Sequence, residues 1–175
     1  MLRLMSDAAP PVQVPRLKTS RLLLREFRAS DFEAYLEGLP EIMLSRPLPD
    51  RRGAWRSFAS ATGLWMLNGA GWWLVEHCET ESFAGMIGVF MREGFPDMEI
   101  GWSLVERFRG QGLAKEGAAA ALAWALERRG AKRVIAHIDH ENARSARVAE
   151  SIGLRYETEV DFYDAKTRRY AVEAP

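Results

Sequence analysis

The chain has 175 residues, and its 24 Lys and Arg residues balance its 24 Asp and Glu residues. This neutrality disfavours proteins that bind nucleic acid or anionic membranes, because both need an excess of positive charge. The length suits one domain with a full hydrophobic core. The single cysteine, Cys78, excludes an intramolecular disulfide and a multi-cysteine metal site, and the three scattered histidines do not suggest a metal either.

No stretch approaches the roughly 20 apolar residues of a membrane span. Residues 1–15 lack the apolar core of a signal peptide, so we expect a cytoplasmic protein. Pro10, Pro11 and Pro15 predict that residues 1–15 form a flexible leader. A single domain is then expected over residues 16–175.

The first part of this domain is predicted as a strand, two helices and a hairpin. Alternation over Leu17–Phe27 predicts the strand, and apolar spacing predicts helices over Asp31–Leu39 and Arg52–Leu67, the first broken by the proline that follows it. Trp72–His77 and Ala84–Met91 flank a short polar turn and predict antiparallel strands. This order is not the strict alternation of a doubly wound sheet.

The second predicted helix carries several aromatic residues, Trp55, Phe58 and Trp65. We favour the interpretation that they pack on the sheet. The alternative is that one of them lines a pocket for a small acceptor molecule, since aromatic side chains form the walls of such sites.

A strand, a glycine-containing loop and a long helix follow. Met98–Val105 alternates with the period of a half-buried strand. From Leu113 onward, alanine and leucine recur at helical spacing up to a stop near Gly130. Between the strand and the helix lie Gly110 and Gly112.

This arrangement predicts an anion cradle. The first turn of the helix has unpaired backbone N–H groups, and the helix dipole adds partial positive charge there. A side chain at either glycine would stop the backbone from closing around a diphosphate, while Arg107, Arg109 and Lys115 supply charge. The glycine patterns of dinucleotide folds and of P-loops are absent. An ordinary glycine turn is the alternative.

The rest of the chain completes the sheet. Lys132–Asp139 predicts a strand parallel to Met98–Val105, because a long helix connects the two. A short helix is expected from Asn142 to Gly153, and an antiparallel pair around residues 164–166 closes the chain.

The loop contains Arg-x-x-Gly-x-Ala at Arg109, Gly112 and Ala114, which resembles the coenzyme A motif of the GNAT (GCN5-related) N-acetyltransferases. Asn142 and Ser145, followed by a short helix and Gly-Leu, look like the second signature of that family.

The opening Thr19–Arg25 segment is similar to the branch that includes the bacterial ribosomal-protein N-acetyltransferases. Together these segments extend the resemblance over nearly the whole chain, from Leu17 to Glu173.

The resemblance implies an α/β (α+β) fold with a single mixed, mostly antiparallel sheet of six to seven strands, a central splayed parallel pair and about four helices. It implies acetyl-CoA as co-substrate, no metal, and a primary amine as acceptor, from a protein N-terminus, a lysine or a small molecule. The amine attacks the thioester directly, and the neutral chain favours a protein or peptide amine. The alternative is a non-catalytic acyl-CoA sensor. Aromatic side chains near Trp72 or Phe162, if exposed, would favour a homodimer.

The resemblance also implies where the cofactor lies. Trp102, Ser103, Leu104 and Val105 would follow its pantetheine arm, and a backbone N–H near Leu104 would hold the oxyanion. The phosphate loop would comprise Arg109, Gly110, Gln111, Gly112, Leu113, Ala114 and Lys115. On the opposing strand end, Asn142 and Ser145 would face the arm and the thiol.

Two residues are the catalytic candidates. Glu99 shares the Gly101 face of the central strand and is the first candidate for the base, with a structural or solvated carboxylate as the alternative. Ser145 is the candidate proton donor to the thiolate, because Ala149 stands where many family members have a tyrosine; the alternative is that Ser145 only caps the helix or binds the arm. Weaker candidates for the base are Glu157, Asp161 and His137.

Overall fold

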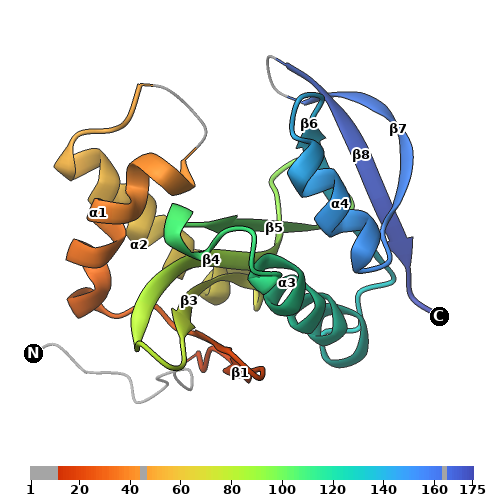
Figure 1. Ribbon diagram of the computed structural model, residues 1–175. Helices are drawn as coiled ribbons and strands as arrows, with labels where there is room; N and C mark the ends of the chain where they lie inside the picture. Colours follow the sequence, from red (N-terminus) through yellow and green to blue (C-terminus); the bar gives the residue numbers. More distant parts are fainter. Residues whose placement is uncertain (1–11, 44–46, 163–164) are drawn as a thin grey trace, which may run out of the picture.

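The computed structural model describes residues 12–43, 47–162 and 165–175. Within them, eight strands form one mixed sheet in the order β1-β2-β3-β4-β5-β6-β8-β7, accompanied by four α-helices (Figure 1). The strands are β1 (Leu17–Lys18), β2 (Leu22–Arg25), β3 (Gly71–His77), β4 (Ser82–Met91), β5 (Met98–Leu104), β6 (Arg133–Asp139), β7 (Arg155–Phe162) and β8 (Ala165–Glu173). The helices are α1 (Phe32–Ile42), α2 (Arg51–Asn68), α3 (Leu113–Ala123) and α4 (Ala143–Ser151).

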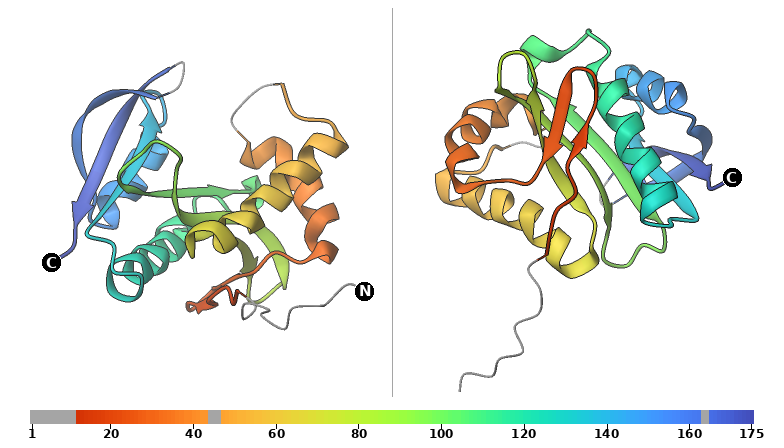
Figure 2. Two further views of the ribbon diagram at one scale, coloured as in Figure 1. Left: turned by 180° about the vertical axis from the view of Figure 1, so that it is seen from behind. Right: turned by 90° about the horizontal axis from the view of Figure 1, so that it is seen from below.

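The predicted architecture is confirmed. Neighbouring strands are antiparallel except β5 and β6, which are parallel. The sheet has one strand more than the upper limit expected, because a turn in which the Thr19 N–H donates to the Leu22 carbonyl separates β1 from β2. The α1–α2 pair and the β6–β8 unit lie on opposite sides of β5 (Figures 1 and 2).

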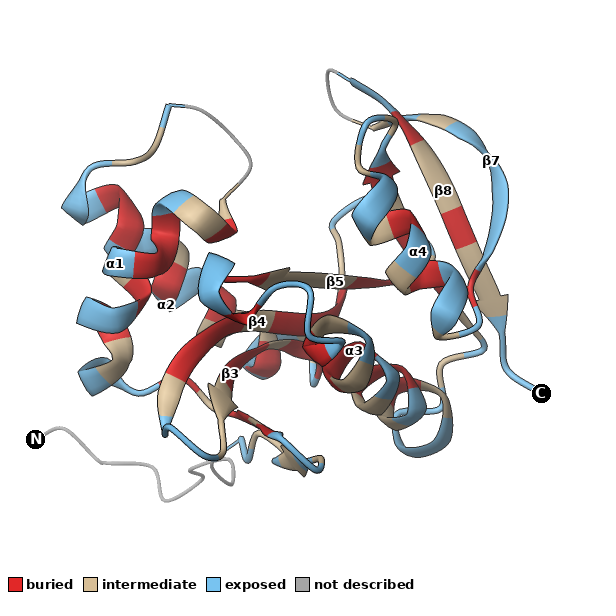
Figure 3. Ribbon diagram, in the orientation of Figure 1, coloured by how far each residue is buried: buried red, intermediate tan, exposed pale blue. Residues whose placement is uncertain are grey.

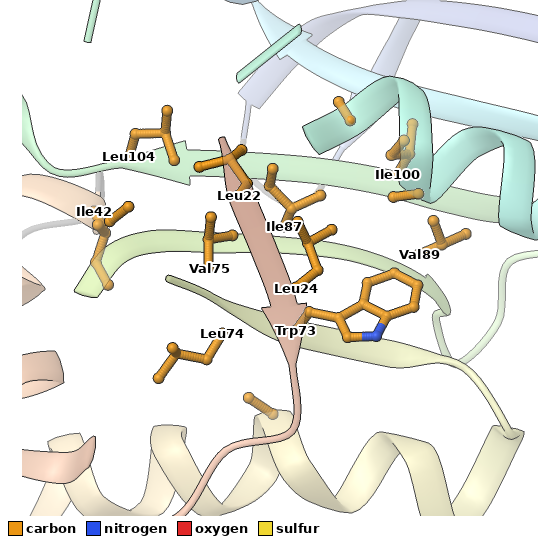
Figure 4. Packing of buried hydrophobic residues seen from close by; sticks show 14 of the residues in the cluster. Leu22, Leu24, Ile42, Trp73, Leu74, Val75, Ile87, Val89, Ile100 and Leu104 are labelled. Atoms are coloured by element: carbon orange, nitrogen blue, oxygen red, sulfur yellow. The ribbon is translucent and has the colours of Figure 1, made fainter. Parts of the chain in front are cut away.

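The two faces of the sheet carry different helices. Helix α3 packs on the face that bears Ile87, and Gly117 permits the close approach, since a Cβ there would lie 2.4 Å from Ile87 Cδ1. Helices α1 and α2 lie over the opposite face, where the Ser103 hydroxyl donates to the Ile42 carbonyl. Buried apolar side chains on both faces of the sheet form one continuous core (Figure 4).

Burial follows the alternation of the strands. Leu22, Leu24, Trp73 and Ile87 are almost completely inaccessible, while the edge strand β7 is largely exposed (Figure 3). Burial of side chains of this size contributes roughly 1.5–3 kcal/mol each to folding. The well-packed centre of the sheet therefore holds β4 and β5 in place.

Helix α1 differs from the sequence prediction at both ends. Pro40 was expected to break the helix but lies inside it, and the helix continues until the Met43 N–H donates to the Leu39 carbonyl. A proline removes only one intrahelical bond, so a helix end that packs against the sheet tolerates it. The helix begins at Phe32, after a short turn in which the Asp31 carboxylate accepts from the Arg28 N–H.

Residues 1–11 of the predicted leader lie outside the described part of the chain. At its end, the Trp73 indole N–H donates to the Pro15 carbonyl over 2.7 Å, and Val14 packs against the core. The last residues of the predicted leader therefore contact the domain. Among the described residues, none of the helices has the length and apolar character to cross a membrane.

The turn before β2 holds the first turn of α3. The Thr19 and Ser20 hydroxyls and the Arg21 N–H all donate to one carboxylate oxygen of Glu116, over 2.6–2.9 Å, and Arg21 Nε donates to the other over 2.8 Å. Burial acts to raise the pKa of Glu116, but the hydrogen bonds from Thr19, Arg21 and Ser20 outweigh it and lower the pKa to about 2. An acidic group there also favours the helix dipole.

We predict that Glu116→Gln lowers the free energy of unfolding at pH 7 by about 1–3 kcal/mol, because it removes charge-assisted hydrogen bonds. The pKa of Glu116 is lower in the folded chain than its ordinary value of 4.5. The stabilisation by the Glu116 carboxylate is therefore complete above about pH 4.5 and is lost as the pH falls towards 2. Denaturant unfolding at pH 7 and pH 3 measures both effects. Glu127→Gln, an exposed change just after α3, is the control; an equal loss in both variants would contradict the prediction.

Candidate active site

The parallel strands β5 and β6 separate after two residue pairs. Met98 pairs with Val134 and Glu99 with Ile135, and beyond them β5 runs to Leu104 with no described strand paired on that edge. β6 also continues, but it pairs with β8 on its other edge. The predicted splayed pair is therefore present, and it leaves one edge of β5 open.

The open edge presents a backbone donor at Leu104. The Val105 N–H donates to the Ala84 carbonyl over 3.0 Å, towards β4. Because N–H groups of successive strand residues point to opposite edges, the Leu104 N–H points away from β4, towards the separated end of β6. None of the described strands pairs with β5 there. The Leu104 N–H can therefore hydrogen-bond to a ligand in the gap.

The loop between β5 and α3 contains two glycines in the left-handed region. Gly110 has φ 76° and Gly112 has φ 77°. A Cβ would meet no atom within 4 Å at Gly110 and only Arg21 Nη2, at 3.7 Å, at Gly112, so backbone conformation and not crowding requires glycine. The N–H groups of residues 110–115 donate to no acceptor in the described chain, and the first bond of α3 joins the Glu116 N–H to the Gly112 carbonyl. This is the geometry of an anion cradle.

Two of the three cations assigned to this cradle are engaged elsewhere. The Arg109 guanidinium donates to the Leu104 and Glu41 carbonyls, which ties the loop to the end of β5 and to α1. Arg107 Nη2 donates to the Phe83 carbonyl over 3.1 Å. Both side chains hold the shape of the loop.

Other positive charge lies beside the cradle. Lys115 is exposed and forms no ion pair with a described residue. Arg21, which sequence reasoning missed, lies next to Gly112 and donates to the Gln111 carbonyl over 3.0 Å. Only the pairing of Arg21 with Glu116 brings it to the loop, and no local pattern in the sequence reveals that long-range contact.

Asn142 and Ser145 lie at the start of α4, beyond the end of β6. The Asn142 side chain accepts from the Ser145 N–H over 3.0 Å, so Asn142 caps the helix. The Ser145 hydroxyl makes no hydrogen bond with another described residue and can contact a ligand. Ala149 is fully buried and offers no polar group.

Glu99 lies on the Gly101 face of β5, as predicted, and is held in a bidentate ion pair. Its two oxygens accept from Arg92 Nε over 2.8 Å and Nη2 over 3.1 Å, and its side chain is 9% exposed. Burial acts to raise the pKa of Glu99, but His137 and Arg92 outweigh it and hold that pKa below its ordinary value. His137 Nδ1 is buried without a hydrogen bond, 3.5 Å from the carboxylate.

Of the three weaker candidates for the base, His137 belongs to this cluster, whereas Glu157 and Asp161 lie on the edge strand β7. Glu157 accepts from Arg133 and Arg169, and the Asp161 side chain is largely exposed.

A pocket of about 520 Å³ lies between the sheet and the α1–α2 pair. Its floor consists of Trp72, Met86 and Ser103, its α1 wall of Tyr35, Ile42 and Met43, and its α2 wall of Arg56, Ser57, Ser60, Ala61 and Leu64. The Trp72 ring covers Gly101, where a Cβ would lie 2.8 Å from it. The pocket therefore meets β5 beside the Leu104 amide and is separated from Glu99 by the indole.

The aromatic residues proposed for such a pocket do not line it. Phe58 and Trp65 are buried core residues, as the favoured interpretation expected, and Trp55 packs edge-on against Phe32. Trp72 lines the pocket instead. The polar α2 residues that do so show no pattern in the sequence that separates them from an ordinary solvated face.

The two aromatic residues named in the argument for a homodimer are only partly exposed. Trp72 is half-buried over the sheet glycines, and the half-buried Phe162 ring stacks on His137 with centroids 4.2 Å apart. Tyr156, on the same strand as Phe162, is 53% exposed, and a homodimer remains a prediction.

We predict that Gly112→Ala weakens binding of coenzyme A at least about tenfold, because alanine in the left-handed region costs roughly 1–2 kcal/mol and displaces the cradle amides. Isothermal titration calorimetry measures the affinity. Gly94 has φ 78° and equally open surroundings, so Gly94→Ala imposes the same strain away from the loop. Equal affinities in the two variants would contradict the assignment of the cradle.

Comparison with known proteins agrees with this geometry. The family model described as Acetyltransferase (GNAT) domain matches residues 21–155. The crystal structure of an acetyltransferase from Agrobacterium tumefaciens is 28% identical, with a TM-score of 0.80, over 96% of this chain and 99% of that one. RimL, solved in complex with coenzyme A, shares the fold with a TM-score of 0.74 at 18% identity, over 89% of this chain and 95% of its own.

Among curated proteins, the uncharacterized protein YkkB of Bacillus subtilis is 37% identical over 90 residues. That alignment spans 50% of this chain and about half, 52%, of YkkB. The family model, by contrast, extends from the start of β2 to the start of β7 and includes the open edge of β5, the cradle and the α4 cap. The chain belongs to the GNAT acetyltransferase family.

Proposed function

We propose that this chain transfers the acetyl group of acetyl-CoA to a primary amine by direct attack. The observation that carries the proposal is the open edge of β5, where the Leu104 amide lies between the cradle and the pocket on the Met86 face. Acetyl-CoA enters the gap between β5 and β6, and the acceptor enters through the pocket. The two substrates thus meet at one strand.

The cradle and the strand edge position acetyl-CoA. The free N–H groups of residues 110–115 bind the diphosphate, with Lys115 and Arg21 near it. The pantetheine arm runs along residues 102–105 and pairs with the open edge in the manner of a missing strand. Asn142 and Ser145 face the arm from the other side of the gap.

The chemistry follows from this placement. The neutral amine attacks the thioester carbonyl, and the Leu104 N–H stabilises the oxyanion that forms on the carbonyl oxygen. Collapse of this intermediate breaks the C–S bond and releases the thiolate. The amine nitrogen loses one proton, and the thiolate gains one.

Ser145 and Glu99 have distinct roles in this proton balance. The unengaged Ser145 hydroxyl donates to the departing thiolate and is replenished from water. Glu99 lies four residues before Ser103, roughly 13 Å along the strand, and behind the Trp72 ring, so it accepts the amine proton only through water that passes this ring. The alternative for Glu99 is a purely structural ion pair with Arg92.

An acyl-CoA sensor with the same fold is the second candidate function. The observation in its favour is the buried Ala149, since α4 has no hydroxyl where many relatives carry a tyrosine. Such a protein would bind coenzyme A tightly and release no thiol with any amine.

We predict that thiol release from acetyl-CoA occurs with at least one member of a panel of N-terminal peptides, lysine peptides and small amines. Ser145→Ala should lower kcat about 10²-fold, the usual range for a lost proton donor, and leave the affinity for coenzyme A within about threefold. Ser151→Ala, at the far end of α4, is the control. Tight coenzyme A binding with no turnover across the panel would contradict transfer and support the sensor.

The pH dependence of kcat/KM should follow the ionisation of the acceptor amine and not that of Glu99. The pKa of Glu99 lies below its ordinary value of 4.5, so this group is ionised throughout the neutral range. We predict that kcat/KM rises with pH to a midpoint near 8 for an α-amine or near 10 for a lysine, since these are their ordinary pKa values. Glu99→Gln should lower kcat and leave the rise of kcat/KM with pH unchanged.

The same variant tests the structural alternative for Glu99. An unchanged kcat together with a lower free energy of unfolding would assign it to the ion pair alone.

A further inference from the structure

The α2 wall of the pocket carries donors with no protein partner. The Arg56 guanidinium forms no ion pair or hydrogen bond with a described residue, and neither do the hydroxyls of Ser57 and Ser60. Arg56 and Ser60 are one helical turn apart, so they share the face that lines the pocket. By contrast, the Thr62 hydroxyl on the same helix donates to the Phe58 carbonyl.

Among the described residues, the other walls of the pocket contain no carboxylate that could pair with Arg56. Among the described residues that line the pocket, none is Asp or Glu, and Arg56 is the one with a permanent charge. Leu64, Trp72 and Met86 make most of the surface apolar. A polycationic amine would therefore meet repulsion from Arg56 and find no carboxylate to compensate it.

We infer that the acceptor is an apolar primary amine that also carries a carboxylate, which Arg56 binds with help from Ser57 and Ser60. This inference rests on the proposed function, since it places the amine beside the thioester at Leu104. An arginine fork binds a carboxylate through two hydrogen bonds, and Arg56 and Ser60 are exposed at the pocket, where an incoming carboxylate can reach them. The carboxylate could belong to a free amino acid or to an acidic side chain next to a peptide N-terminus.

The test compares acceptors that differ only in this charge. In the small-molecule arm, leucine is compared with leucinamide at equal concentrations of neutral amine. In the peptide arm, Leu-Glu amide is compared with Leu-Gln amide. Spermidine serves as the polycationic acceptor. We expect kcat/KM for the charged member of at least one pair to exceed that of its neutral partner about tenfold to hundredfold. The arm that responds identifies the source of the carboxylate.

Arg56→Gln should remove this preference and leave the affinity for coenzyme A unchanged. Arg52→Gln is the matched control, because Arg52 is an exposed arginine one turn earlier on α2 that does not line the pocket. The preference should survive in the control. Equal kcat/KM values within both pairs, or a preference that persists in Arg56→Gln, would overturn the inference while transfer itself stands.

A binding measurement separates this inference from the proposed function. Calorimetric titration of the coenzyme A-loaded protein with the same pairs reports recognition without chemistry. Carboxylate-dependent binding that Arg56→Gln abolishes, in a protein that turns over no amine, would support carboxylate binding at Arg56 but contradict transfer, and with it the identification of this ligand as an acceptor. Absence of any charge dependence in both binding and turnover would overturn the inference.

Discussion

The site depends on the point at which β5 and β6 stop pairing. Two parallel pairs, at Met98 and Glu99, hold the strands together at one end. Beyond them β6 pairs with β8 and β5 pairs with β4, each on the edge away from the gap, and no described strand fills the edges that face each other across it. An unpaired strand edge in the middle of a sheet is costly unless water or a ligand satisfies it. A ligand that supplies the missing partner gains hydrogen bonds that the protein already presents.

Charge in this molecule mainly fixes backbone geometry around that edge. Arg109 holds the end of β5 to α1, and Glu116 joins the first turn of α3 to the β1–β2 turn. Arg92 and Glu99 form a partly buried ion pair near the point where the strands separate. With these groups engaged, the free N–H groups of the cradle and the unpaired Lys115 remain for an anion. The neutral composition is therefore compatible with a local site for a highly charged cofactor.

The sequence predicted the features that follow from local chemistry. The glycine loop, the strand–helix–strand unit and the Asn142 cap each depend on residues close together in the chain, and each lies where it was expected. The predicted end of α1 at Leu39 was wrong, because a helix end that packs against the sheet tolerates Pro40. Arg21 at the loop and Arg56 at the pocket could not be predicted, because only tertiary contacts bring them there. Likewise, alternation placed Glu99 on its face but could not reveal its ion pair with Arg92.

Hydrogen–deuterium exchange with and without coenzyme A tests the central claim most directly. If the open edge of β5 and the cradle hold the cofactor, the amides of Leu104 and of residues 110–115 should exchange more slowly when it is bound. The amides of the exposed strand β7 should exchange at the same rate in both states. Unchanged exchange at Leu104 and across the cradle at saturating coenzyme A would contradict the account.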